Sequence, residues 1–470
     1  MECAILAAFV VYFFILLIIG YVAYRKSKKA ADYTLGNRTL SFWVTGLAAH
    51  ASETSSFIFM GFPAAVYANG LIEGWTAIGL TFFMFLNWRL IAPKLRAATE
   101  KLHSSTLSTF FEQRFHDQSG LLRIVSALFA LLFFMFYISA GLVALGILFE
   151  SLFNIPYIVG ILFGTVVVFY TLLGGFLSIS WIDFFQGMFL LTTVIIVPLF
   201  ALSYIGGFSS IAAAAQAKNI SLNLLPSFSW TSLRDIIFTA AGWGLGYFGQ
   251  PHILTKFMGI NDVNQMRKAQ WVGIGWQILS YTAATCVGLI GLAFFKNGLV
   301  NNDLIFVNMV RTLFPQFIAG FILCALVAAA INVMSAQVLV SASIIAEDFY
   351  KRFIKQTGRV LSTKIAFVSR LSVVGLCIIA GTVALCSHNK PIYELTRYPW
   401  SGLGCTFGPL LLVSLHSKMM NRYAALAGII VGGATAGLWP LVNQTIPSMI
   451  VGFTASFVAM FVVIALSKKA

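Results

Sequence analysis

Apolar segments long enough to cross a lipid bilayer recur along almost the whole chain. A helix needs about 20 apolar residues to cross the ~30 Å hydrocarbon core of a membrane. Charged residues make up only 10% of the 470 residues, whereas they make up about 25% of an ordinary soluble domain. The sequence therefore predicts an all-α integral membrane protein surrounded by the lipid bilayer.

Thirteen segments satisfy this requirement, within one polytopic domain that spans residues 1–470. Basic residues follow the first apolar run, in YRKSKK, whereas they precede the run in a cleavable signal peptide. We therefore expect this first segment to remain as a transmembrane helix. The predicted spans are 4–24, 41–67, 73–92, 122–150, 156–174, 180–205, 232–257, 269–295, 315–346, 364–386, 394–416, 422–442 and 447–467.

The distribution of basic residues predicts the orientation. With the N-terminus outside, 24 of the 30 Lys and Arg residues fall on the cytoplasmic side and 6 on the outside. Cytoplasmic loops of membrane proteins are enriched in these residues. We therefore expect an outside N-terminus and a cytoplasmic C-terminus. The same bias explains the net charge of +15, so we expect no nucleic-acid partner, and no obligate protein partner is evident.

Polar and helix-breaking residues interrupt the second segment, in AHASETSSFIFMGFP. A carboxylate at this depth, Glu53, costs at least ~2.5–3.5 kcal/mol on insertion scales, so a functional role is expected. Gly61 and Pro63 disfavour a continuous helix. A broken helix would free the carbonyl groups of Ala51 and Thr54 for a small cation, and the N-terminus of its second half would favour an anion. The alternative is a kinked helix whose serines bond to its own backbone.

The seventh segment is interrupted in the same way, by four glycines and a proline in TAAGWGLGYFGQPHIL. Trp243 and Tyr247 would share a face of a helical turn, beside a gap that suits a small apolar solute. Ordinary interfacial aromatic residues are the alternative. Asp183, near the cytoplasmic end of the sixth segment, is either a charge favoured by the helix dipole or a gating residue.

The chemistry of an enzyme is not evident. The six histidines are scattered without metal-ligand spacing. The phosphate-loop pattern GxxxxGK[ST] is absent, and none of the six cysteines forms a CxxC pair. We therefore expect a protein that is not an enzyme and has no cofactor.

Several motifs together resemble bacterial sodium/proline symporters of the sodium:solute symporter family. They are GNRTLSFWVTGLAAHASETSSFIFMGFPAA, YTLLGGFLSISWIDFFQG, GWGLGYFGQPHIL and QVLVSASIIAEDFYK. The resemblance extends through essentially the whole chain. It implies sodium-coupled uptake of L-proline across the bacterial inner membrane. It also implies a five-plus-five inverted-repeat core at 41–386, with peripheral regions at 1–40 and 387–470.

The resemblance also assigns roles to single positions. The essential intramembrane aspartate of the family falls on Glu53, and Arg38 and Asp183 match residues implicated in ion coupling. The sodium-ligating carbonyl groups fall on Ala51, Thr54 and Ala329. The proline-site residues fall on Ser55, Ser56, Phe57, Trp243, Tyr247 and Pro251.

The chain departs from the family pattern at several of these positions. Asn332 and Val333 replace a Ser-Thr pair of sodium ligands, and only the asparagine side chain has an oxygen that can ligate a hard cation. Glu53 is one methylene longer than the aspartate. Ser56 stands where glycine is usual, and Phe57 where tryptophan is usual. These departures leave three outcomes open, a sodium site that is weakened, remodelled or lost, and in a remodelled site Asn332 is the expected replacement ligand.

The first interpretation is a sodium-coupled secondary symporter that imports L-proline by alternating access. The second is a proton-coupled symporter for proline or another small amino or carboxylic acid, because dehydration favours the protonated form of a buried carboxylate such as Glu53. The third is a transporter-derived sensor or channel. Broken helices at two sites argue against an open pore.

Overall fold

The computed structural model describes residues 2–26, 35–171, 175–350 and 359–467. The end of the predicted span 156–174 and the basic stretches at 27–34, 351–358 and 468–470 lie outside the described residues. Within the described residues the regular structure is helical, apart from an isolated β-bridge between Leu40 and Ile260. The predicted all-α fold class is therefore confirmed.

Each predicted span coincides with one helix or with a pair of helices that a break separates. The continuous helices are α1 (Glu2–Lys26), α5 (Gly74–Leu90), α8 (Leu121–Phe153), α9 (Tyr157–Thr171), α10 (Gly175–Tyr204), α14 (Met266–Phe294), α16 (Gln316–Ser343), α18 (Arg359–Leu385), α19 (Ile392–His416), α20 (Arg422–Val442) and α21 (Ser448–Ser467). The broken pairs are α3 (Phe42–Ala51) with α4 (Gly61–Asn69), and α12 (Trp230–Gly244) with α13 (Pro251–Met258).

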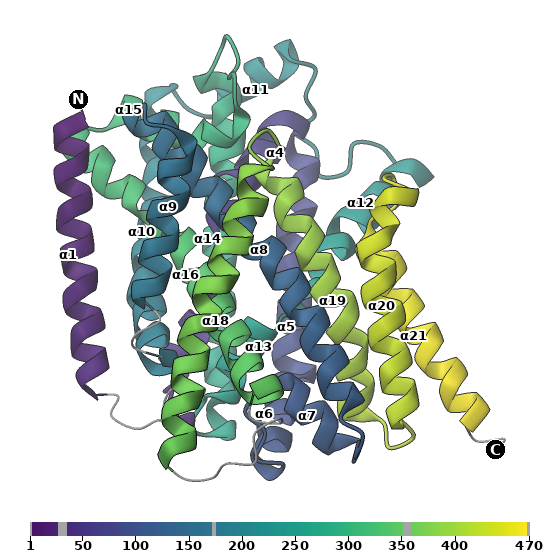
Figure 1. Ribbon diagram of the computed structural model, residues 1–470. Coiled ribbons are helices and arrows are strands. Elements are labelled where there is room, and N and C mark those ends of the chain that lie inside the picture. The colour runs from purple at the N-terminus through teal and green to yellow at the C-terminus, as the bar shows by residue number, and fades with distance from the viewer. Residues whose placement is uncertain (1, 27–34, 172–174, 351–358, 468–470) are drawn as a thin grey trace.

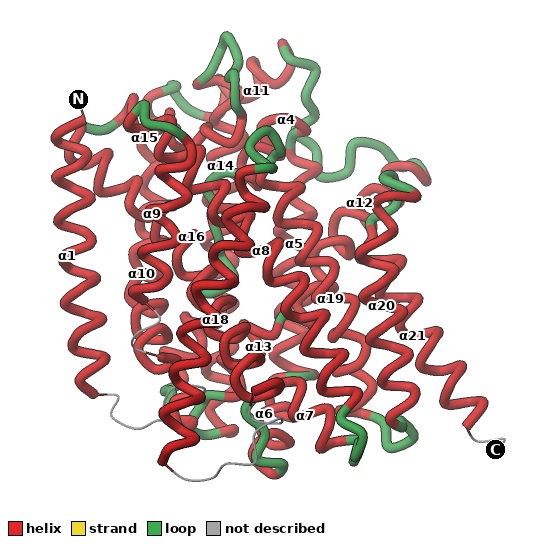
Figure 2. The backbone as a smooth tube through the Cα atoms, in the orientation of Figure 1, coloured by secondary structure: helices red, strands yellow, loops and turns green. Residues whose placement is uncertain are grey.

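Short helices connect these elements. The α-helical connections are α6 (Ala92–Lys101), α7 (Leu107–Arg114), α11 (Phe208–Ala217) and α15 (Ile305–Leu313). The 3₁₀ turns are η1 (Gly36–Arg38), η2 (Ser56–Ile58), η3 (Leu71–Glu73), η5 (Leu245–Gly249), η6 (Val263–Gln265) and η7 (Asn302–Leu304), and the π-helical turn η8 (Ile344–Tyr350) extends α16. Figure 2 shows that the loops gather mainly at the two ends of the bundle.

The termini lie at opposite ends of the bundle (Figure 1), as an odd number of crossings requires. We call these ends the N-terminal face and the C-terminal face. By length and hydropathy, eight helices of the described chain qualify as membrane spans. Breaks and shorter apolar helices account for part of the difference, and the number thirteen stays a prediction.

The contacts of the helices follow an approximate two-fold relation. Helix α14 packs against α3 as α5 packs against α12, and α16 packs against α10 as α8 packs against α19. Figure 1 shows α4 near the N-terminal face and α13 near the C-terminal face, so the two broken helices run in opposite directions. This arrangement agrees with a five-plus-five inverted repeat. Because α19 contacts η5, we propose a core that extends past residue 386 to His416.

The glycines of the second break allow a close approach to α19. A Cβ atom on Gly249 would lie 2.6 Å from the carbonyl oxygen of Leu403 and 2.7 Å from the backbone nitrogen of Gly408. Side chains at this position would force two backbones apart. The packing requirement therefore explains part of the unusual glycine content of GWGLGYFGQP.

We expect Gly249→Ala to lower stability by about 1–3 kcal/mol, the usual cost of overpacking. The measurement is the melting temperature of the detergent-purified protein. Gly375→Ala is the matched control, because among the described residues no atom beyond its chain neighbours and its own helix backbone lies within 4 Å of a Cβ at this position of α18. Equal melting temperatures for the two variants would contradict the packing explanation.

Candidate functional site

The first break separates α3 from α4 and is buried throughout residues 52–60. Its side chains bond to the local backbone: the Thr54 hydroxyl donates to the His50 carbonyl at 2.8 Å, and the Ser55 hydroxyl accepts from the Phe57 N–H at 3.1 Å. Among the described residues, no backbone hydrogen bond of the break ends on the carbonyl oxygen of Ala51 or Thr54. These two oxygens remain available for a cation.

Helix α16 packs against the first break. Ala329, Asn332 and Val333 are all buried on this helix. Neither side-chain polar atom of Asn332 has a hydrogen-bond partner within the described structure. A buried amide without a partner is costly, and its oxygen is of the type that hard cations prefer. Among the described residues, no group of three or more His, Cys, Asp and Glu could hold a metal ion.

The Glu53 carboxylate lies between the two breaks. The Tyr281 hydroxyl donates to its Oε1 atom at 3.2 Å, and the Tyr247 hydroxyl of the second break faces the same carboxylate. The side-chain amide of Gln277 donates to the Tyr247 hydroxyl at 2.8 Å. Tyr281 and Gln277 are four residues apart on α14, so one face of this helix contacts both breaks.

A small central cavity joins the predicted residues of the two breaks. Its volume of about 10 Å³ is enough for about one water molecule. It is lined by Glu53, Ser55, Phe57, Leu80, Tyr137, Trp243, Tyr281, Thr396 and Trp400.

Three residues predicted for the proline site do not line the central cavity. Ser56 is buried in the turn η2, and Tyr247 lies behind the cavity with its hydroxyl toward Glu53. Pro251 instead lines a separate cavity near the C-terminal face, together with Thr106 and Thr255. The structure therefore brings together only part of the predicted set.

Three aromatic rings, Phe57, Trp243 and Tyr393, form what we call the aromatic lid. The Phe57 ring centroid lies 4.7 Å from that of Trp243 and 5.7 Å from that of Tyr393. The Tyr393 hydroxyl accepts from Trp243 Nε1 at 2.8 Å and donates to a Glu73 oxygen at 3.4 Å. Because Phe57 and Trp243 line the cavity and Tyr393 does not, the lid separates the cavity from the space beyond Tyr393.

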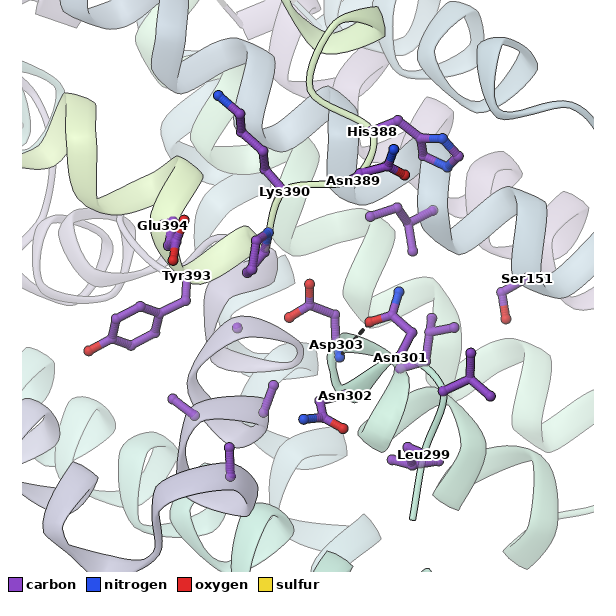
Figure 3. A pocket seen from close by; sticks show the side chains of 18 of the residues that line it. Ser151, Leu299, Asn301, Asn302, Asp303, His388, Asn389, Lys390, Tyr393 and Glu394 are labelled. Atoms are coloured by element: carbon purple, nitrogen blue, oxygen red, sulfur yellow. Dashed lines mark hydrogen bonds between the residues drawn. The ribbon is translucent and has the colours of Figure 1, made fainter. Parts of the chain in front are cut away.

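Beyond the lid lies a vestibule of about 920 Å³ near the N-terminal face. Figure 3 shows Tyr393 at one edge of it and Asp303 beside Asn301. Carboxylates and amides dominate its polar lining, with Lys390 and His388 at the loop before α19. Burial raises the pKa of the Asp303 carboxyl group above its ordinary value, although the Ile392 N–H donates to it at 3.2 Å.

We expect Tyr393→Phe to raise the solute concentration needed for half-maximal uptake about threefold to tenfold. The variant keeps the ring but removes both hydrogen bonds of the lid, each of which contributes about 0.5–1.5 kcal/mol. Concentration-dependent uptake in proteoliposomes measures the effect. Tyr204→Phe, at an exposed tyrosine of α10, is the control, and equal values for both variants would contradict the role of the lid.

Hydrogen bonds close the C-terminal face. Arg38 donates to the Met258 carbonyl at 2.9 Å, and Arg96 donates to the Ile260 carbonyl at 2.8 Å. Asp183 forms a buried ion pair with Lys256 at 2.8 Å. The predicted coupling residues Arg38 and Asp183 thus both contact α13 or the segment that follows it.

Lys256 was not predicted as a site residue. Its side chain is buried in α13, where all eight residues are buried. For Asp183 the sequence leaves a charge favoured by the helix dipole and a gating residue as alternatives, and the structure adds a specific cation beside it. The available signal was a single lysine within the apolar run PHILTKFM.

Other residues of the central cavity carried no distinguishing signal. Tyr137, Tyr281 and Trp400 lie in long apolar helices. Because the full sequence has 15 Tyr and 10 Trp, these three do not stand out by residue type. Their places beside Glu53 depend on how the helices pack. Thr396 and Tyr393 were missed for the same reason.

The chain matches the model of the sodium:solute symporter family over residues 33–432. It is 39% identical over 460 residues to the high-affinity proline transporter PutP of Bacillus subtilis, covering 96% of each chain. It is 37% identical over 444 residues to the sodium/proline symporter of Escherichia coli, covering 92% of this chain and 87% of the relative.

Solved structures support the fold. A Na⁺-coupled sialic acid symporter superposes with a TM-score of 0.82 at 20% identity, covering 98% of each chain. Mhp1, a nucleobase-cation-symport-1 transporter, superposes with a TM-score of 0.58 at 13% identity, covering 92% of this chain and 94% of Mhp1. The protein is a transporter rather than an enzyme. With a family match over most of its length and these relatives, the chain belongs to the sodium:solute symporter family.

Proposed function

We propose that this protein is a sodium-coupled secondary symporter that imports L-proline by alternating access. The convergence of two helix breaks on one small cavity, with a carboxylate at its edge, carries the proposal. The names of the relatives from Bacillus subtilis and Escherichia coli support proline as the solute, and the latter name supports sodium as the ion. We place the protein in the bacterial inner membrane with its N-terminus outside.

In this proposal the sodium ion binds between the first break and α16. The ligands are the carbonyl oxygens of Ala51, Thr54 and Ala329 and the side-chain oxygen of Asn332. Two observations support this set: the carbonyl oxygens of Ala51 and Thr54 accept no backbone hydrogen bond of the break, and the Asn332 amide has no partner among the described residues. Val333 contributes packing only. The negative charge of Glu53, close by, stabilises the ion at this depth.

The solute binds in the central cavity. The pyrrolidine ring packs against Phe57 and Trp243, and the carboxylate lies near the N–H groups of the first break. Ser55 and Ser56 belong to this break. Tyr247 and Pro251 belong to the second break and do not line the cavity, so their effect on the solute is indirect. Because the cavity of about 10 Å³ is smaller than proline, the walls must move outward during binding.

Alternating access then consists of opening one end while the other stays closed. The vestibule leads to the aromatic lid from the outside, and the contacts of Arg38 and Asp183 hold the cytoplasmic end closed. Sodium binding orders the first break and raises the affinity for proline. By linkage, proline raises the affinity for sodium by the same factor.

The test uses purified protein in liposomes and labelled L-proline. An inward sodium gradient is compared with a matched inward proton gradient without sodium. We expect uptake with the sodium gradient only. Uptake that follows the proton gradient and ignores sodium would overturn the ion assignment and favour the proton-coupled alternative. No uptake under either gradient would overturn the solute assignment.

A further inference from the structure

A histidine side chain lies beside the Glu53 carboxylate, and neither of the two nearest atoms has a hydrogen-bond partner among the described residues. His50 Nδ1 lies 3.9 Å from Glu53 Oε2. Both side chains are buried, and within the described structure neither atom takes part in a hydrogen bond. A distance of 3.9 Å is about 1 Å longer than a hydrogen bond between nitrogen and oxygen. Two unpartnered polar atoms in a dry site are costly unless they pair in another state of the protein.

The other nitrogen of the imidazole determines where the ring carries its proton. Trp88 Nε1 donates a hydrogen bond to His50 Nε2 at 3.3 Å. An indole N–H can only donate, so Nε2 must be the acceptor and carries no proton. A neutral imidazole then has its proton on Nδ1. The donor of the ring is therefore Nδ1, the atom that lies 3.9 Å from Glu53 Oε2.

The surrounding helices leave a fitted space for the imidazole. A Cβ atom on Gly273 of α14 would lie 2.3 Å from Cδ2 and 2.4 Å from Nε2 of His50. The rings of Trp88 and Trp276 lie with their centroids each 6.2 Å from that of His50. The ring is thus held between α3, α5 and α14, and small movements of these helices move Nδ1 relative to Glu53.

We propose that His50 is a positioning residue for Glu53, whose Nδ1–H binds Oε2 directly when the ion orders the first break. Tyr281 then holds Oε1 and His50 holds Oε2, so the carboxylate has one orientation toward the ion. The inference deepens the proposed sodium symport and rests on it. The His50 imidazole also connects the ion site to Trp88 of α5, which donates to its Nε2 atom.

The test compares two amides that each replace one half of the imidazole. His50→Asn places an N–H donor close to the position of Nδ1, whereas His50→Gln reaches the position of Nε2 and leaves the Nδ1 position empty. In His50→Gln we expect the sodium concentration for half-maximal uptake to rise about tenfold, the usual loss for a hydrogen bond to a charged group. The maximal rate should change less than twofold, and His50→Asn should lie near the wild type.

Gly273→Ala provides a second test, because it displaces the imidazole without changing His50 or Glu53. We expect it to raise the half-maximal sodium concentration in the same direction as His50→Gln. Gly275→Ala on the same helix is the control, since among the described residues no atom beyond its chain neighbours and its own helix backbone lies within 4 Å of a Cβ there. Sodium affinity unchanged in His50→Gln, or impaired equally in His50→Asn, would overturn the positioning role.

Sodium-dependent thermal stabilisation of the purified variants gives a readout without proline. If the wild type takes up no proline but is stabilised by sodium, only the solute assignment fails. The sodium-dependent stabilisation of His50→Gln relative to His50→Asn then still decides the inference. A wild type that is neither stabilised nor driven by sodium would overturn the proposed function and this inference with it.

Discussion

We expect sodium-driven proline uptake to fall about 100-fold in Glu53→Gln, while the amount of folded protein stays unchanged. The variant keeps the size of the side chain and removes the charge that faces the proposed ion site. Loss of charge-assisted interactions of about 3 kcal/mol corresponds to this factor, since 1.4 kcal/mol changes an equilibrium tenfold. Initial uptake rates in proteoliposomes, at several sodium concentrations, measure the effect.

Glu394→Gln is the matched control for this experiment. Glu394 is an exposed carboxylate in the lining of the vestibule, so we expect uptake within twofold of the wild type. If Glu53→Gln keeps the sodium dependence of the wild type, Glu53 does not couple the ion. A similar loss in both variants would point to a general effect of negative charge on uptake.

The second large effect concerns the buried ion pair. Lys256→Met leaves the Asp183 carboxylate without its cation, in a place where both side chains are almost fully buried. Removing one partner of a buried pair costs about 3–5 kcal/mol because it leaves an uncompensated charge, and a second substitution at Asp183 removes that charge. We expect a strongly reduced melting temperature for Lys256→Met and recovery in the double variant Asp183→Asn with Lys256→Met.

The double variant separates stability from transport. If Asp183 and Lys256 only stabilise the fold, the double variant regains uptake together with its melting temperature. If the charge on Asp183 takes part in coupling, as proposed, the melting temperature recovers and sodium-driven uptake does not. Equal melting temperatures for Lys256→Met and the wild type would contradict the buried pair itself.

The sequence was sufficient for the features that depend on local composition. Runs of about 20 apolar residues predict membrane helices because of bilayer thickness. The glycines and Pro251 of the second break predict an interrupted helix, whichever helices pack around it. Glu53 was identifiable because a carboxylate inside an apolar segment has a high cost. These predictions needed no knowledge of which helices are neighbours.

The remaining site residues depend on tertiary contacts. Tyr281 reaches Glu53 from 228 residues away along the chain, and Tyr393 reaches Trp243 from 150 residues away. The role of Lys256 was missed because local composition does not show that all eight residues of α13 are buried. The distinction between Tyr247, which touches Glu53, and Pro251, which lies in another cavity, also requires the folded arrangement.

One feature of α14 has a mechanical consequence. Its residues Tyr281 and Gln277 are one helical turn apart, and they hold the first and second break respectively. Because both hydrogen bonds come from one helix, we expect a change in the angle of one break to be transmitted through α14 to the other. In a variant that lacks one of these hydrogen bonds, we expect the two breaks to move independently, so that sodium crosses without proline.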